Sequence, residues 1–193
     1  MMAQLVLTLN TMFVGASQPQ AGGDIRRAVD IVSAAKYGRR RFFFVGNGAS
    51  ASIASHMAAD FLKTGGMKAQ CFNDGALLTC LANDLGYEHC FDVPLGIHAQ
   101  TGDLLFAISS SGVSRNIINA AQSANALGLV VITLSGFAPD NPLRKLGAVN
   151  FYVPSDRYGV VEVVHHAICH AILDEVVAFH VALSPSSWSA KRI

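Results

Sequence analysis

Short apolar runs alternate along the chain with segments whose apolar residues recur every three or four positions. The apolar runs predict short β-strands, and several of them are apolar at every position rather than at alternate positions. Continuous apolar runs are typical of strands that are covered on both faces of a parallel sheet. The predicted strands are 41–45, 68–72, 104–108, 129–134 and 149–153.

The segments between these strands have the periodicity of amphipathic helices. The clearest of them are 24–37, 50–63, 114–127 and 158–183. Strands that alternate with helices build parallel βαβ units, so the expected fold class is α/β, a three-layer α/β/α sandwich around a five-stranded parallel sheet. Since the sequence contains no repeat or linker, residues 1–193 are predicted to form a single domain, with an N-terminal helical segment over 1–23 and a loosely held tail over 184–193.

The composition is unusually apolar for a chain of this length. Hydrophobic residues make up 51% of the 193 residues and charged residues only 14%, against about 25% in typical soluble domains. This excess predicts that partner subunits bury part of the surface, as in an obligate oligomer. The net charge of +1 argues against a nucleic-acid partner and against an anionic membrane surface.

The sequence offers no clear targeting or membrane-spanning segment. Residues 1–23 are uncharged but lack the basic start of a secretory signal, and polar residues interrupt them well short of the length of a membrane span. The four cysteines form neither a CxxC pair nor a compact framework. We therefore expect reduced thiols and a cytoplasmic location.

The first predicted strand leads into a glycine-rich loop, Gly46-Asn47-Gly48-Ala49-Ser50, and then into a helix. Glycines allow a tight turn, and the amide groups of a helix N-terminus can bind an anion. The string also satisfies the dinucleotide fingerprint G-x-G-x-x-A, for which Asp74 would be the ribose-binding acid. A plain turn with Ser50 as the helix N-cap is the structural alternative.

The third predicted strand leads into a loop with four hydroxyl groups, Ser109-Ser110-Ser111-Gly112-Val113-Ser114, again followed by a helix. The hydroxyl and amide groups together could bind a phosphate monoester without a lysine. A solvated serine-rich turn with an N-cap is the alternative. Two such loops on neighbouring strands favour one sugar phosphate bound across the crevice over a dinucleotide.

Two helices carry candidate acid, base or metal-ligating groups. His56 and Asp60 are four residues apart and share a helix face. On the last helix Glu162, His165 and His170 are predicted to share another face, and His166 lies about 100° around the helix from His165. His56, Asp60, Glu162 and His170 could hold a divalent metal such as zinc or work as an acid/base pair, whereas His165 and His166 are interpreted as structural or interfacial.

Taken together, GNGAS, HxxxD, AND, SSSGVS and ExxH-x4-H resemble the SIS (sugar isomerase) domain, and most closely the phosphoheptose isomerase family. The resemblance covers about residues 24–180. It implies a flavodoxin-like five-stranded sandwich, assembled as a homotetramer with its sites between subunits.

The resemblance also assigns roles to individual residues. His56, Asp60, Glu162 and His170 match the family's metal-binding and catalytic positions, with Asp60, His170 and Glu162 as the catalytic candidates. Zinc is the implied metal, and no NAD or flavin is expected. The implied substrate-binding residues are Asn47, Gly48, Ala49, Asn83, Asp84, Ser109, Ser110, Ser111 and Ser114. From the residues alone, Asn83 and Asp84 could equally be a helix-capping pair.

Three positions depart from the family pattern. Ala49 replaces a glycine, Asp60 replaces a glutamate and so withdraws the carboxylate by one methylene, and Glu162 replaces a glutamine. The last two changes could compensate, with Glu162 taking over as the base, or they could signal a different sugar phosphate or a loss of activity.

The reaction that the resemblance implies is an aldose–ketose isomerisation through an enediol(ate), with sedoheptulose 7-phosphate as the expected substrate. The alternative is a SIS module that binds a phosphosugar or a protein without catalysis, as in the DnaA-associating initiator proteins of the same family. A dinucleotide-dependent oxidoreductase is a more distant alternative.

Overall fold

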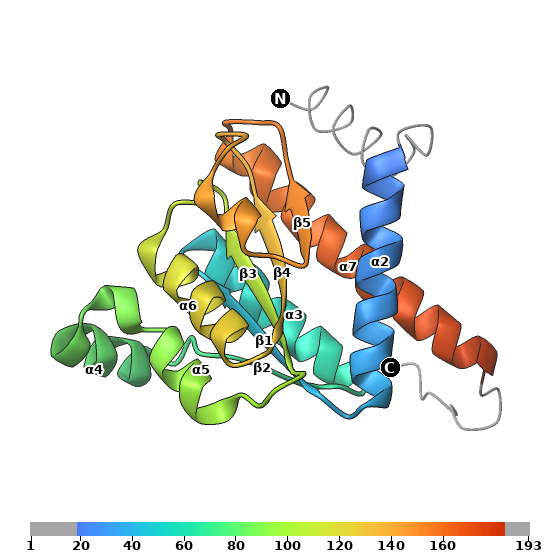
Figure 1. The fold of residues 1–193 in the computed structure, drawn as a ribbon, viewed down its shortest axis with the longest axis horizontal. Helices are drawn as coiled ribbons and strands as arrows, with labels where there is room; N and C mark the ends of the chain where they lie inside the picture. The colour runs from blue at the N-terminus through green and yellow to red at the C-terminus, as the bar shows by residue number, and fades with distance from the viewer. Residues whose placement is uncertain (1–18, 184–193) are drawn as a thin grey trace.

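Five parallel strands form one sheet in the order β2-β1-β3-β4-β5 (Figure 1). The computed structural model describes residues 19–183. In it the strands are β1 (Arg41–Gly46), β2 (Lys68–Cys71), β3 (Leu104–Ser109), β4 (Val130–Ser135) and β5 (Val149–Tyr152). Chain connections leave β1 and β3 in opposite directions, which places the topological switch point at the carboxyl ends of these two strands. The predicted α/β class and parallel sheet are confirmed.

Helices cover both faces of the sheet and complete a three-layer sandwich (Figure 1). They are α2 (Pro19–Tyr37), α3 (Ala49–Lys63), α4 (Gly75–Leu85), α5 (Asp92–His98), α6 (Arg115–Ala126) and α7 (Tyr158–Leu183), with short 3-10 turns at Tyr87–His89 and Pro142–Lys145. One apolar core joins the sheet to α2, α3 and α7, and a second core joins the opposite face to α5 and α6.

Aromatic packing fixes α3 against the centre of the sheet. Phe61 of α3 lies with its ring centroid 5.0 Å from that of Phe44 on β1 and 5.6 Å from that of Phe106 on β3. The rings of Phe44 and Phe106 stack at 4.6 Å, and all three side chains are fully buried. Contacts of this kind each add about 0.5–1.5 kcal/mol beyond the burial of apolar area. They hold the outer face of α3 in a defined position, next to α7.

The helices differ from the prediction more than the strands do. Helix α2 begins at Pro19 rather than at residue 24, and α4 and α5 were not among the predicted helices. Helix α4 has no fully buried residue within this chain, and its partly buried Leu77 and Leu78 pack against the second core. Helix α5 contains Pro94 and Gly96, two residue types with low helix propensity, so its sequence does not predict a helix. The predicted tail over 184–193 and residues 1–18 of the N-terminal segment lie outside the described residues.

Within residues 19–183, none of the helices combines the length and the apolar character needed to cross a bilayer. All four cysteines carry free thiols. Burial raises the pKa of the Cys169 thiol to about 12, so this side chain belongs to the apolar core and stays protonated.

Candidate functional site

The loop between β1 and α3 presents backbone amides to the switch point. Gly48 is the N-cap of α3 and has a φ of 55°, a left-handed conformation that favours glycine. No side chain caps the helix, and Ser50 is buried in its first turn rather than serving as the cap. A side chain at Gly46 would overlap the backbone of Ser50, so the loop needs a glycine there. The Ser50 and Ala51 amides donate to the Asn47 and Gly48 carbonyl oxygens at 2.9 and 3.0 Å, so within the described residues the Gly48 and Ala49 amides are the ones left for a ligand.

The serine loop between β3 and α6 is held in place by its own hydroxyl groups. The Ser109 hydroxyl donates to the Ser114 hydroxyl at 3.3 Å and accepts the Gly112 amide at 3.2 Å. Ser114 is the N-cap of α6, but its side chain makes no capping hydrogen bond. The Ser110 hydroxyl is buried and forms no hydrogen bond within the described part of the chain. An unpaired buried hydroxyl is costly, which points to a ligand as its partner.

The two loops and the start of α7 enclose a cleft of about 240 Å³. Seven of the nine residues predicted to bind substrate line it, and Ser50, Ile108, Tyr158 and Glu162 complete the lining. The seven are Asn47, Gly48, Ala49, Ser109, Ser110, Ser111 and Ser114. Neither lysine nor arginine is among the lining residues and Glu162 adds a carboxylate, so neutral hydroxyl and amide donors and two helix N-termini are the groups that could bind an anion there.

Asn83 and Asp84 are not part of this cleft. They lie exposed on α4, where the Asn83 amide donates to the Asp84 carboxylate at 2.7 Å. Asp74, the acid that a dinucleotide site would need, accepts the Leu77 amide at 2.9 Å and caps the start of α4. Its position is explained by capping, which leaves the dinucleotide alternative without support.

A pair of side-chain amides ties the two loops together. The side-chain amides of Asn47 in the first loop and Asn116 of α6 exchange two hydrogen bonds of 2.9 Å. The Tyr87 hydroxyl donates to the side-chain oxygen of Asn47, Oδ1, at 2.9 Å. Asn116 is almost completely buried, so the pair is shielded from water on that side. These bonds fix the orientation of Asn47, and sequence reasoning missed both Asn116 and Tyr87 because their role depends on contacts between distant segments.

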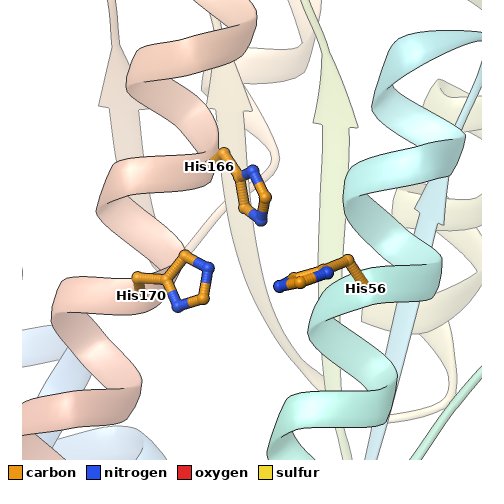
Figure 2. Close-up of side chains that lie close together, drawn as sticks. All are labelled: His56, His166 and His170. Carbon is orange, nitrogen blue, oxygen red and sulfur yellow. The ribbon is translucent and has the colours of Figure 1, made fainter.

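Three imidazole rings face one another between α3 and α7 (Figure 2). Ring centroids of His56 and His166 are 4.8 Å apart, those of His56 and His170 5.3 Å, and those of His166 and His170 4.7 Å. One nitrogen atom from each ring lies within 4.8 Å of the other two. Nitrogen atoms gathered in this way could hold a divalent transition metal.

Asp60 adds a carboxylate to this histidine cluster. Its Oδ2 atom lies 3.1 Å from Nε2 of His56 and 4.0 Å from Nδ1 of His170. The side chains of His56, Asp60 and His170 are 50%, 30% and 38% exposed, so substrate could reach them from solvent. The predicted pairing of His56, Asp60 and His170 is therefore present, with the carboxylate between the two imidazoles.

The last helix presents a different face from the one that spacing predicted. Glu162, His166 and His170 follow one another at intervals of four, with Glu162 at the cleft and both histidines in the cluster. His165 instead points into the core, where its Nε2 lies 3.1 Å from the Ser135 carbonyl oxygen. The interpretation of His165 as structural agrees with this placement, but the same interpretation of His166 does not, because His166 joins the candidate site.

Burial affects the two neighbouring histidines to different degrees. It lowers the pKa of His165 to about 4, against a smaller opposing effect of the hydrogen bond to Ser135. Burial also lowers the pKa of His166, helped by the neighbouring His170 and His56 and opposed by the Asp60 carboxylate. His165 is therefore neutral near pH 7, as its surroundings require.

Comparison with known proteins decides the family. The model of the SIS domain matches residues 14–136. A phosphoheptose isomerase of Akkermansia muciniphila is 30% identical over 160 residues, which are 80% of this chain and 84% of that protein. A phosphoheptose isomerase of Aliarcobacter butzleri is 35% identical over 148 residues, 70% of this chain and 77% of that protein. The chain belongs to the phosphoheptose isomerase family of SIS domains.

Solved structures agree with this assignment of the SIS domain. The phosphoheptose isomerase of Neisseria gonorrhoeae superposes with a TM-score of 0.81 and 25% identity, covering 92% of this chain and 96% of that one. The Vibrio vulnificus NanR protein, solved as a complex with ManNAc-6P, shares the fold with a TM-score of 0.63 and 20% identity, covering 95% of this chain and 62% of that one.

Proposed function

We propose that this SIS domain is a phosphosugar isomerase that interconverts sedoheptulose 7-phosphate and a heptose 7-phosphate. The observation that carries the proposal is one face of α7, which joins an anion-binding cleft at Glu162 to a cluster of histidines and a carboxylate at His166 and His170. Along a helix axis, eight residues span about 12 Å. A phosphate held in the cleft would leave the sugar chain free to lie along this face, toward the cluster.

The serine loop would bind the phosphate, far from the carbon atoms that react. Its binding energy then orients the substrate instead of taking part in proton transfer. The buried Ser110 hydroxyl, which lacks a partner within residues 19–183, would gain one from a phosphate oxygen. Asn47, fixed by Asn116, would contact the substrate between the phosphate and the reacting end.

A base and an acid are needed to move a proton between neighbouring carbons of the sugar. Asp60 is the proposed base, with Glu162 of the cleft as the alternative, because each places a carboxylate along the path of the substrate. His170, 4.0 Å from Asp60, is the proposed acid or metal ligand, and His56 supports the same position. No step requires NAD or flavin, since the enediol(ate) route transfers a proton and leaves the oxidation state of the whole molecule unchanged.

The cluster fits a metal ion as well as proton transfer. His56, His170 and Asp60 bring two imidazoles and a carboxylate together, and nitrogen and carboxylate oxygen atoms are the usual zinc ligands. Zinc would supply Lewis-acid stabilisation of the oxygen that becomes negatively charged in the enediolate.

The test is an assay of sedoheptulose 7-phosphate turnover in the wild type and two isosteric variants, with and without added zinc. We expect Asp60→Asn to reduce kcat by at least about a hundredfold, which is the lower end of the effect of a general base. Glu162→Gln is the matched control, which restores the family's residue, and it should keep most of the activity. The reverse pattern would make Glu162 the base.

A panel of hexose and pentose phosphates tests whether the substrate is a different sugar. Turnover of none of the phosphosugars by the wild-type protein, together with measurable binding by calorimetry, would refute the isomerase and assign a phosphosugar-binding module instead. Full activity in both carboxamide variants would refute the proposed roles of the carboxylates.

We also propose that the protein works as a homotetramer with its sites at subunit boundaries. Helix α4 supports this, because it is rich in apolar residues and none of them is fully buried within one chain. Leu85 of α4 and Ile97 of α5 are 50% and 77% exposed. The site would gain Asn83 and Asp84 if α4 of one subunit met the cleft of another. Free thiols at all four cysteines support the proposed cytoplasmic location, which cell fractionation can test.

A further inference from the structure

A third histidine stands where the family resemblance predicts only two. His166 lies one turn before His170 on α7, and both rings face His56 across the gap between α3 and α7 (Figure 2). The resemblance instead assigns Glu162 to the metal. In the structure the group of possible metal ligands among the described residues contains His56, His166 and His170 and leaves out both Glu162 and Asp60.

The surroundings of His166 leave one of its nitrogen atoms without a partner. Nε2 of His166 is buried and forms no hydrogen bond within residues 19–183. His89 lies 3.0 Å from Asp92, whereas His165, whose Nε2 bonds to the Ser135 carbonyl oxygen, also has an unpaired buried Nδ1 but lies in the core, away from the cluster. Leaving a buried polar atom unpaired costs about 1–3 kcal/mol, so the position of His166 calls for a ligand.

The geometry is close to that of a metal site. Zinc–nitrogen bonds of about 2.0–2.1 Å place the nitrogen ligands of a tetrahedral ion about 3.4 Å apart. The three nitrogen atoms already lie within 4.8 Å of one another, so small rotations of the exposed His56 and half-buried His170 side chains would bring them to this spacing. Three nitrogen ligands would leave the fourth position of a tetrahedral ion open, as in catalytic zinc sites, with the Asp60 carboxylate beside the cluster as the proposed base.

We propose that His56, His166 and His170 form a three-nitrogen site for a divalent transition metal such as zinc, with the fourth position left open. Three imidazole ligands favour zinc, cobalt or nickel over magnesium and calcium, which prefer oxygen ligands. Glu162 is then free of the metal and remains in the cleft. The use of this site in isomerisation rests on the proposed function, whereas the binding of the metal does not.

The experiment measures metal binding by the full-length protein, without any assay of turnover. Zinc affinity is determined by competition with a chromogenic chelator, and bound cobalt is followed by its visible absorption. Loss of an outer-shell partner of a metal ligand already weakens binding by 10–100-fold, so His166→Ala should weaken zinc binding by at least about tenfold and change the cobalt spectrum. His89→Ala, which removes a histidine outside the cluster, and Glu162→Gln should both bind zinc as the wild type does.

A measurement on the wild-type protein removes any dependence on how the variants fold. Nitrogen NMR of the histidine side chains should show three imidazoles shifting together when one equivalent of zinc is added. Shifts of His56 and His170 alone, a loss of zinc affinity in Glu162→Gln but not in His166→Ala, or the absence of stoichiometric zinc or cobalt binding would each overturn the proposal. An inactive protein that still binds zinc through three histidines would refute the proposed function and leave this site standing.

Discussion

Replacing the buried His165 by glutamine is expected to make the fold less sensitive to acid. His165 lies in the core with its side chain fully buried, and its Nε2 donates to the Ser135 carbonyl oxygen of β4. Glutamine can keep a donor near that position and cannot be protonated in the same range of pH. The substitution therefore removes a titrating group while leaving a polar partner for Ser135.

The magnitude follows from the difference in pKa between the folded and unfolded states. Burial lowers the pKa of His165 from 6.5 to about 4, so the folded protein binds this proton less readily than the unfolded chain does. The stability that neutral His165 provides is complete above the unfolded pKa and is lost progressively as the pH falls toward 4. At about 1.36 kcal/mol per pKa unit, the full effect is about 3 kcal/mol, of which about 2 kcal/mol is lost between about pH 7.5 and pH 5.

Urea unfolding followed by circular dichroism at these two pH values measures the effect. The loss of unfolding free energy on acidification should be about 2 kcal/mol smaller in His165→Gln than in the wild type. The difference between the two pH values carries the prediction, because the altered packing of glutamine lowers stability equally at both. His98→Gln, which replaces an exposed histidine, is the control and should lose as much stability as the wild type. Equal losses in all three proteins would refute the reasoning.

Two further predictions concern the serine loop and the assembly. Gly112 has a φ of 67°, and a Cβ there would overlap the side-chain amide of Asn141, so Gly112→Ala should lower the unfolding free energy by about 1–3 kcal/mol and weaken phosphate binding. Gly96→Ala, a helical position with open space around it, should be neutral or stabilising in the same urea experiment. For the assembly, sedimentation equilibrium should give a tetramer, and Leu85→Lys or Ile97→Lys should shift it toward smaller species. A wild-type monomer at micromolar concentration would contradict the proposed tetramer.

The strands could be predicted closely because their signal is local. Continuous apolar runs placed each strand within one residue of its observed ends, as with Leu104–Ser109 against the predicted 104–108. The places of the glycine-rich loop and the serine loop could also be predicted, since a loop after a parallel strand must lie at the carboxyl edge of the sheet. Helix α4 was missed although Leu77, Leu81 and Leu85 recur every four residues, a spacing typical of a helix.

The part of the candidate site on α3 could be predicted from that helix alone. His56 and Asp60 share a face whatever α3 packs against, and the structure places them 3.1 Å apart. On α7 the choice between His165 and His166 depends on which side of the helix meets the sheet, and an apolar helix of this length leaves that choice open. The spacing of His166, four residues after Glu162 and four before His170, is the signal that could have found it.

The spacing along α7 also has a consequence for selectivity. One continuous helix, α7, carries Tyr158 and Glu162 at the cleft and His166 and His170 in the histidine cluster. The distance between the cleft and the imidazoles is therefore set by helical pitch rather than by a movable loop. A substrate that must contact both the cleft and the histidine cluster needs a certain length. A shorter sugar bound by its phosphate in the cleft would not reach the histidines. The fixed distance along α7 would therefore select sugars by the number of carbon atoms in the chain, before differences in stereochemistry affect binding.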